Sequence, residues 1–349
     1  MVPQRRFAAV LFLALASCAG AGQDGRVEKP LSAPLVIAHR GASGERPEHT
    51  LAAYDLAIAQ GADVIEPDLV PTRDGVLVAR HENEIGETTD VAAHPEFGGR
   101  RTSKTIDGRV VTGWFTEDFT LAELKRLRAR ERLPELRPAN TRYDGREPIP
   151  TLGEVIALAK RRSAELGRTI AIYPETKHPT YFAGIGLGTD EPLVRELYAA
   201  GWSTPDAPVF IQSFEVANLQ RLAGMTRLRL IQLLDAAGGP ADGARPGYAA
   251  MVTSRGLRDV ARYAWGIGPA KAMLGDGALV RDAHRAGLRV HPWTFRAENR
   301  FLAEHHRRGA DPGARGDLVG EIRAALRLGI DGFFTDFPAI GVSARDKDQ

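Results

Sequence analysis

The sequence predicts an α/β protein, a (β/α)8 barrel with an insertion over one mouth. From Leu35 onward, short β-branched or apolar runs alternate with helical patterns, which is typical of repeated βα units around a parallel sheet. The 349 residues are enough for one large barrel, and a composition of 43% hydrophobic and 26% charged residues is that of a globular protein. We therefore expect one barrel domain over residues 34–340.

The first 17 residues predict an export signal. Arg5 and Arg6 precede an apolar stretch over residues 7–16, which is too short to remain as a membrane-spanning helix. The tetrapeptide Leu-Ala-Ser-Cys that ends at Cys18 is similar to a bacterial lipobox, in which the cysteine is lipidated. We expect an exported protein of the bacterial periplasm or cell envelope, lipid-anchored at Cys18, with a flexible tether over residues 18–33. A plain secretory signal, with Cys18 incidental, is the alternative.

Cysteine count and charge exclude several classes of site and partner. Cys18 is the only cysteine, which excludes an intramolecular disulfide, a CxxC pair and a thiolate zinc site. Any metal must therefore be held by oxygen or imidazole. The 46 basic residues nearly balance the 44 acidic ones, which argues against nucleic acid as a partner. We expect contact with a membrane only through the N-terminal lipid anchor.

Nine apolar or β-branched runs are candidate strands, one more than a closed barrel of eight strands can hold. We expect one of the two runs that flank the turn at residues 72–75 to play an irregular part. The candidate strands are Leu35–His39, Val64–Leu69, Val76–Arg80, Thr169–Tyr173, Val209–Ser213, Leu228–Leu234, Gly266–Pro269, Leu288–Trp293 and Gly332–Thr335.

Helices are predicted between these strands, several of them with capping residues at their ends. Residues 84–148 interrupt the rhythm with turn residues and one convincing helix, which indicates an insertion over a barrel mouth. Residues 341–349 are expected to be a polar tail. The predicted helices are Leu51–Gln60, Leu121–Arg130, Leu152–Leu166, Val194–Ala200, Val216–Ala223, Leu279–Ala286 and Leu318–Leu328.

Carboxylates follow two of the predicted strands. Glu66 and Asp68 are two residues apart and point the same way, as do Glu175 and Lys177. Three converging carboxylates repel one another by about 4 kcal/mol per pair at ~4 Å and an effective dielectric of about 20. One hard divalent cation would neutralise them, which favours Ca²⁺ or Mg²⁺ over zinc or copper, with Ca²⁺ preferred. Lys177 neutralising one charge without a metal is the alternative.

Two histidines and an arginine also stand at predicted strand ends. His39 and His81 suit a displacement in which one group accepts a proton and another donates one. Arg40 offers a forked donor that matches phosphate oxygens, although a surface salt bridge would be its commoner fate. Combined with the carboxylates, these residues indicate phosphoryl transfer to water or to an internal hydroxyl.

Longer stretches of the chain resemble the glycerophosphodiester phosphodiesterases. Residues 37–85, from IAHRGASGERPEHT to VLVARHENEI, resemble the N-terminal core of that family. The PEHT motif and the long insertion resemble its periplasmic branch. Further similar motifs are YPETK at 173–177, FIQSF at 210–214, HPWTFR at 291–296 and DGFFTDFP at 331–338. The resemblance covers about residues 35–340.

The resemblance implies a TIM-type barrel that hydrolyses glycerophosphodiesters, small-molecule substrates, to sn-glycerol 3-phosphate and an alcohol. It implies attack on phosphorus by the glycerol hydroxyl of the substrate, giving a cyclic phosphate that water opens. The chain departs from the family at Glu82, where aspartate is common, so the role of Glu82 beside the imidazole is open. By motif, His39 and His81 are the acid–base pair, Glu66, Asp68 and Glu175 hold the metal, and Arg40 and Lys177 face the phosphate.

Some residues and functions stay open at this point. Phe214 and Trp293 are candidates either for the pocket that binds the glycerol carbons or for barrel-core aromatics. His49 is expected to be structural or solvent-facing, and His178 to have a surface or structural role. Alternative functions are a phospholipase- or sphingomyelinase-type phosphodiesterase of the same superfamily, and a non-catalytic surface-binding lipoprotein. Head-group preference and oligomeric state are not predicted.

Overall fold

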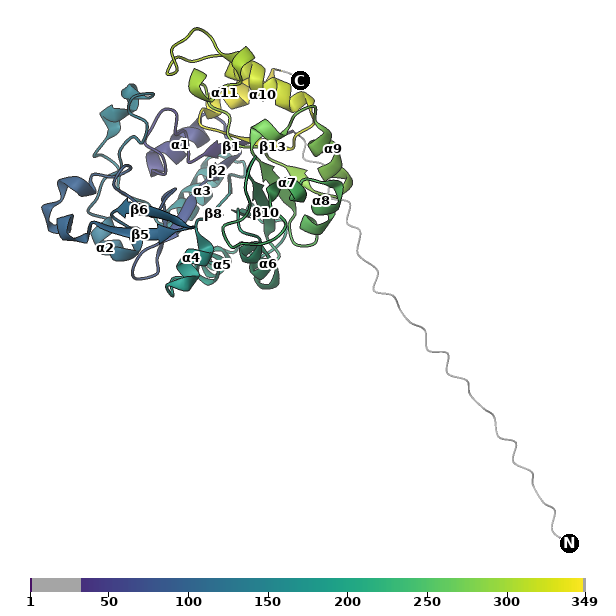
Figure 1. The fold of residues 1–349 in the computed structure, drawn as a ribbon, viewed down its shortest axis with the longest axis horizontal. Helices are drawn as coiled ribbons and strands as arrows, with labels where there is room; N and C mark the ends of the chain where they lie inside the picture. Colours follow the sequence, from purple (N-terminus) through teal and green to yellow (C-terminus); the bar gives the residue numbers. More distant parts are fainter. Residues whose placement is uncertain (2–32, 348–349) are drawn as a thin grey trace. The chain divides into compact units, whose positions relative to one another are not determined.

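A computed structural model describes Met1 and residues 33–347 (Figure 1). The predicted signal, Cys18 and the tether up to residue 32 lie outside these residues. Ala33–Gln349 is assigned to one compact unit. Within the described part, no helix combines the length and the apolar character needed to cross a lipid bilayer.

Eight parallel strand positions close into the predicted barrel. The strands form two runs, in the order β13-β1-β2-β7 and β12-β11-β10-β9-β8-β3. Parallel bridges join both ends of the first run to the second. One links Ile172 in β7 to Val209, and the other links Thr335 in β13 to Phe295. Around the barrel, the positions are β1 (Leu35–His39), β2 with β3 (Val64–Glu66 and Asp68–Pro71), β7 with β8 (Ala171–Ile172 and Glu175–Thr176), β9 (Phe210–Ser213), β10 (Arg229–Leu234), β11 (Gly266–Pro269), β12 (Arg289–Val290) and β13 (Gly332–Thr335).

Two barrel positions are split where a proline interrupts the ladder. Pro67 separates β2 from β3, and Pro174 lies between β7 and β8. Proline has no N–H to donate to the ladder, so the regular strand pairing is interrupted near the carboxyl end of each strand. The residues that follow the breaks are Asp68 and Glu175, two of the predicted metal ligands.

The predicted strand over Val76–Arg80, which follows the turn at residues 72–75, is the irregular one, as expected. β4 (Leu77–Ala79) pairs antiparallel with β3, with Leu69 opposite Ala79, and stands beside the barrel instead of in its wall. The Thr72 hydroxyl donates to Asp74 at 2.6 Å, and Gly75 takes a φ of +76° in the turn that joins them. This hairpin carries the chain back to His81 at the barrel mouth.

The longer predicted helices form, and they lie outside the barrel. α3 has the predicted bounds and ends at Gly167, whose φ of +63° favours glycine. The α-helices are α1 (Leu51–Ala59), α2 (Leu121–Leu124), α3 (Leu152–Leu166), α4 (Pro179–Gly184), α5 (Asp190–Ala199), α6 (Val216–Met225), α7 (Tyr248–Met251), α8 (Ser254–Val260), α9 (Ala278–Arg285), α10 (Leu318–Arg327) and α11 (Pro338–Asp346). Single 3₁₀ turns outside the insertion are η5 (Lys271–Met273), η6 (Asn299–Phe301) and η7 (Glu304–His306).

One predicted helix was too long, and the predicted polar tail was wrong in part. The helix expected over Leu121–Arg130 stops at Leu124, because Ala129 and Arg130 donate their backbone N–H groups to Glu147 and Thr88 across the insertion. Residues 341–346, expected to begin a polar tail, are instead part of α11. There the buried Gly341 and Ala344 bring the helix against the barrel.

Residues 84–148 form the predicted insertion, with a core of their own. Ile85, Phe97, Phe119 and Leu127 are buried there against barrel residues that include Phe182. Figure 1 shows its hairpin, β5 (Thr102–Ile106) with β6 (Arg109–Gly113), near β8. The other segments are η1 (Val91–Ala93), η2 (Pro95–Arg100), η3 (Thr116–Asp118) and η4 (Pro138–Tyr143).

Candidate active site

Barrel register brings the predicted acids and one histidine to adjacent strand ends. His39 is the last residue of β1 and pairs with Glu66, the last residue of β2. Asp68 and Glu175 are the first residues of β3 and β8 and pair with each other. Functional side chains of such barrels gather at these carboxyl ends, so the predicted convergence is confirmed.

Glu66, Asp68 and Glu175 form a buried acidic cluster. One carboxylate oxygen from each lies within 4.8 Å of the others. Burial, then the neighbouring carboxylates, raises the pKa of Glu66. Burial also raises the pKa of Glu175 to about 8, against the opposing effect of Lys177. Three buried acids this close cannot all stay ionised without a neighbouring positive charge.

The positively charged side chains beside the acidic cluster do not satisfy all of its carboxylate oxygens. Lys177 Nζ lies 3.0 Å from Glu175, and Arg40 Nε lies 3.4 Å from Asp68. Asp68 Oδ1 is buried and has no hydrogen-bond partner. An unpartnered buried carboxylate oxygen among three carboxylates, with no sulfur ligand, fits a hard divalent cation. Neutralisation by Lys177 alone does not account for that oxygen.

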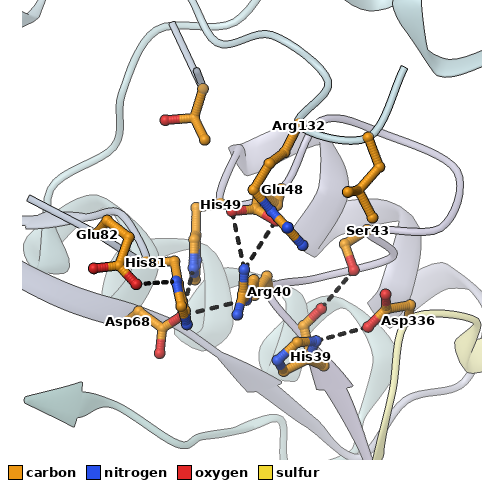
Figure 2. A network of polar contacts seen from close by, with 12 residues as sticks. His39, Arg40, Ser43, Glu48, His49, Asp68, His81, Glu82, Arg132 and Asp336 are labelled. Carbon is orange, nitrogen blue, oxygen red and sulfur yellow. Dashed lines mark hydrogen bonds and ion pairs between the residues drawn. The ribbon is translucent and has the colours of Figure 1, made fainter. Parts of the chain in front are cut away.

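His39 is held in one orientation by a carboxylate that sequence reasoning did not single out. Its Nδ1–H donates to Asp336 at 2.6 Å, which leaves Nε2 available for chemistry (Figure 2). Asp336 also accepts from Arg137 at 2.6 Å and from Arg296 at 3.0 Å. Although burial acts to raise it, these cations hold the pKa of Asp336 well below its usual range. Burial lowers the pKa of His39 to about 4.

His81 has a carboxylate partner of its own. Its Nδ1–H donates to Glu82 at 2.9 Å, and its Nε2 accepts from Lys177 Nζ at 3.3 Å. Desolvation, then Arg40 and Lys177, lowers the pKa of His81 to about 3. The glutamate that replaces the usual aspartate therefore contacts the imidazole. Its second oxygen accepts from His178 at 3.0 Å, and His178 in turn donates to Asp107 at 2.5 Å.

Arg40 stands where the chain turns sharply after β1. Its φ of +60° aims its backbone N–H at Glu66, at 2.8 Å, while its guanidinium donates to both oxygens of Glu48. The next residue, Gly41, has a φ of +86°, and a Cβ there would lie 2.6 Å from the backbone of Ala53. The turn therefore needs glycine to hold Arg40 against the acidic cluster.

Phe214 and Trp293 lie together at the mouth of the barrel. Their ring centroids are 5.6 Å apart in an edge-to-face contact, and both rings are half-buried. Trp293 donates its indole N–H to the Gly268 carbonyl at 2.8 Å, which fixes the ring. Phe214 lines a cavity of about 760 Å³ together with His81 and Glu175.

Several residues that complete the site were missed or misjudged. His49 is fully buried and not solvent-facing, because it donates to Asp68 at 2.9 Å. Gln212 donates to Glu66 at 3.0 Å from the end of β9. The polar residue two positions before Phe214 on a strand was a usable signal for Gln212. His178 gave no such signal, because its partner Asp107 is 71 residues away in the insertion.

Comparisons with known proteins show the family of this chain. The model of the glycerophosphoryl diester phosphodiesterase family matches residues 39–340. A glycerophosphodiester phosphodiesterase of Arabidopsis thaliana is 36% identical over 333 residues, 89% of this chain and 86% of that protein. One of Haemophilus influenzae is 29% identical over 363 residues, 94% of each chain.

Solved structures share the fold. A phosphodiesterase of Oleispira antarctica, in complex with the product sn-glycerol-3-phosphate, superposes with a TM-score of 0.60 at 22% identity and covers 91% of this chain and 98% of that one. A glycerophosphodiester phosphodiesterase of Thermotoga maritima has a TM-score of 0.53 at 19% identity, with 89% and 98% covered. With the family match over most of its length, this chain belongs to the glycerophosphoryl diester phosphodiesterase family.

Proposed function

We propose that this enzyme hydrolyses glycerophosphodiesters to sn-glycerol 3-phosphate and an alcohol. The observation that carries the proposal is the pairing of two imidazoles, each held at Nδ1 by a carboxylate, with a cluster of three buried acids. The match to the family model supports the same reaction.

The two histidines carry the protons in this proposal. Both are neutral near pH 7, with pKa values lowered to about 4 for His39 and about 3 for His81. A neutral imidazole accepts a proton at once. The negative charge of a bound phosphate raises the pKa of a nearby imidazole and favours its protonated form. Each histidine thus changes its protonation state during a turnover.

The reaction proceeds in two displacements at phosphorus. In the first, a glycerol hydroxyl gives its proton to one histidine and forms a P–O bond, while the bond to the alcohol breaks. The other histidine protonates that alcohol. In the second, water gives its proton to the histidine that lost one in the first and forms a P–O bond. The ring P–O bond breaks, and the histidine that gained a proton in the first displacement protonates the released glycerol oxygen.

Glu66, Asp68 and Glu175 would hold one divalent cation, and we assign Ca²⁺ to the site. Mg²⁺ is usually bound through one or two carboxylates, whereas Ca²⁺ accepts more, so three carboxylates favour Ca²⁺. The bound cation would supply charge stabilisation at the phosphoryl oxygens. Arg40 and Lys177 would contact the phosphate from the chain itself.

Phe214 and Trp293 are assigned to the glycerol end of the substrate. Phe214 lines the cavity that also contains Glu175 and Lys177, and Lys177 Nζ lies 5.9 Å from its ring centroid. Packing glycerol carbons against these half-buried rings would place the hydroxyl groups near the acidic cluster.

Turnover with and without a chelator tests the proposal. Glycerophosphocholine should release glycerol 3-phosphate, and EDTA should abolish release until Ca²⁺ is added back. His39→Ala and His81→Ala should each lower kcat by about 10²–10⁴-fold. Arg262→Gln, an exposed change on the outer surface, is the matched control. Turnover that survives both histidine variants would overturn the roles, and no turnover with any glycerophosphodiester would favour a binding protein.

The export and lipid-anchor assignment rests on sequence alone. We infer that residues 1–17 direct export and that Cys18 receives the lipid, which would hold the enzyme at the cell envelope. A cell that expresses the full chain should incorporate labelled fatty acid into it. Cys18→Ser should remove the label and shift the protein from the membrane to the soluble fraction. Label retained by this variant would contradict the assignment.

A further inference from the structure

A second cavity, of about 740 Å³, meets the first one at the active site. His81 and Arg132 line both cavities. The second cavity also contacts Arg40, and it continues between residues 132–136 of the insertion and the loop that follows β12. A group that leaves phosphorus beside His81 can therefore enter it.

The two cavities have opposite charge. Eight carboxylates line the first cavity, one of them Glu175, against the cations Arg109, Arg132, Lys177 and protonated His178. Four guanidinium groups line the second cavity, from Arg40, Arg132, Arg296 and Arg300. The carboxylates on its wall are Glu135 and Asp311, and Asp311 already accepts the backbone N–H of Gly313 at 2.9 Å.

The arginines around this cavity share their carboxylates. Glu48 is shared between Arg40 and Arg132, at 3.0 and 2.8 Å. Asp336 is shared among Arg137, Arg296 and the ring of His39. Arg40 also contacts Asp68, and Arg137 also contacts Glu298.

Arg300 has no acidic partner within residues 33–347. Arg132 and Arg296 meet their acids through Nε, which leaves their Nη nitrogens to donate into the cavity. Burial, with repulsion from Arg40, Arg137 and Arg132, lowers the pKa of Arg296 against the opposing charge of Asp336. These guanidinium groups therefore lie close enough to repel one another.

A phosphate group is the ligand that this arrangement fits. Guanidinium groups present paired N–H donors at the spacing of phosphate oxygens, and clustered arginines recognise phosphate in this way. In the proposed function, the glycerol end lies in the first cavity. Attacking and leaving oxygens are in line at phosphorus, so the alcohol leaves on the side opposite the glycerol hydroxyl. Arg40 and His81, which are assigned to the phosphate and to proton transfer, line the second cavity.

We propose that the cavity of Arg132, Arg296 and Arg300 binds a second phosphate, carried by the leaving alcohol of the substrate. This inference rests on the proposed function and narrows it to a substrate class. The preferred diesters are those whose alcohol is itself phosphorylated or is a further glycerol phosphate unit. Neutral or cationic alcohols, such as glycerol or choline, are accepted less well.

Two matched substrates test the proposal. Glycerophosphoglycerol and bis(glycerophospho)glycerol release the same first product, and their alcohols differ by one glycerol phosphate unit. The wild-type KM should be about fivefold lower for the second substrate, and 0.5 M NaCl should erase most of that difference. Arg300→Gln should bring the two KM values together and leave the two kcat values in their wild-type ratio. Arg262→Gln, with an exposed side chain in the turn after α8, should preserve the KM difference.

The outcomes separate this proposal from the one on which it rests. Equal wild-type KM values, or a KM difference that Arg300→Gln leaves intact, would overturn the second phosphate site while hydrolysis stands. Absence of turnover with both substrates would overturn the proposed function. In that case, calorimetry of the EDTA-treated protein tests the second phosphate site separately. The site requires that bis(glycerophospho)glycerol bind more tightly than glycerophosphoglycerol and that Arg300→Gln remove this difference.

Discussion

The two active-site histidines are held by different parts of the molecule. His39 donates to Asp336, which follows β13 in the barrel wall and is itself fixed by two arginines. His81 donates to Glu82, whose second oxygen accepts from His178. Figure 2 shows both carboxylate contacts, one on each side of Arg40.

The supports also differ in exposure and in origin. The Asp336 side chain is 2% exposed, whereas that of Glu82 is 51% exposed. The support of His81 ends at Asp107, in the turn between β5 and β6 of the insertion. One imidazole is therefore positioned by a buried carboxylate at the end of a barrel strand, which Arg137 of the insertion also contacts, and the other depends on a hairpin that the insertion adds. The comparison predicts that damage to the two supports has unequal cost.

Loss of the Asp336 charge should have the largest effect. Asp336→Asn keeps the shape of the side chain, but Arg296 loses its acid and the ring of His39 is no longer fixed with hydrogen on Nδ1. We expect kcat to fall by as much as about 10⁴-fold, as for a triad aspartate. We also expect a stability loss of about 3 kcal/mol from the unpaired buried charges. Steady-state kinetics and thermal melts measure the two effects. A lower Tm with unchanged kcat would show that Asp336 only stabilises the fold.

Loss of the hairpin contact should cost much less. In His178→Gln, Glu82 still accepts from His81 but loses the imidazole on its other side. In Asp107→Asn, the His178 that contacts Glu82 loses its own charged partner. We expect kcat to fall by about fivefold, with KM changed little, because the imidazole is less well positioned. Asp259→Asn, an exposed acid on α8, is the matched control. A fall as large as that of Asp336→Asn would contradict the difference between the two supports.

The hairpin contact should also depend on pH. Although burial acts to lower it, hydrogen bonds to Asp107 and Glu82 raise the pKa of His178 to about 9, against the charge of Lys177. A raised pKa in the folded state means that the stabilisation is full below about pH 6.5 and is lost as the pH rises through about 9. The Tm difference between wild type and His178→Gln should therefore be larger at pH 6 than at pH 9.5. A constant difference would contradict a charged His178.

Local patterns predicted most of the barrel and the core of its site. Period-two alternation placed Glu66 and Asp68 on one face of a strand, and barrel register then brought Glu175 beside them. Such features depend on neighbours in sequence and on a fold with fixed register. The helix predicted over Leu121–Arg130 stops early because its C-terminal half bonds to Thr88 and Glu147, in irregular segments of the insertion. Pro338 at the first position of α11 was a usable signal for a helix there. The polar composition of residues 341–349 favoured a tail instead.

The supports of the two histidines mark where sequence reasoning ends. Asp336 lay inside a motif that resembled the family, but its bond to His39 spans 297 residues. The bond between His178 and Asp107 depends on how the insertion folds back over the mouth. Neither separation has a periodicity, so only tertiary structure reveals which carboxylate meets which imidazole.

The smallest effect is expected at Glu82, where the family commonly has aspartate. Aspartate is one methylene shorter and can meet His81 but not His178 as well. Glu82→Asp should lower kcat only about twofold. The contact with His178 is lost, but this loss is partly offset because the shorter side chain has fewer rotamers to lose in holding the imidazole. In Glu82→Asp, the side chain at position 82 no longer reaches His178, so His178 has no link to His81. Adding His178→Gln should therefore lower kcat no further. A further fivefold fall in the double variant would show that His178 acts on the reaction by a route other than Glu82.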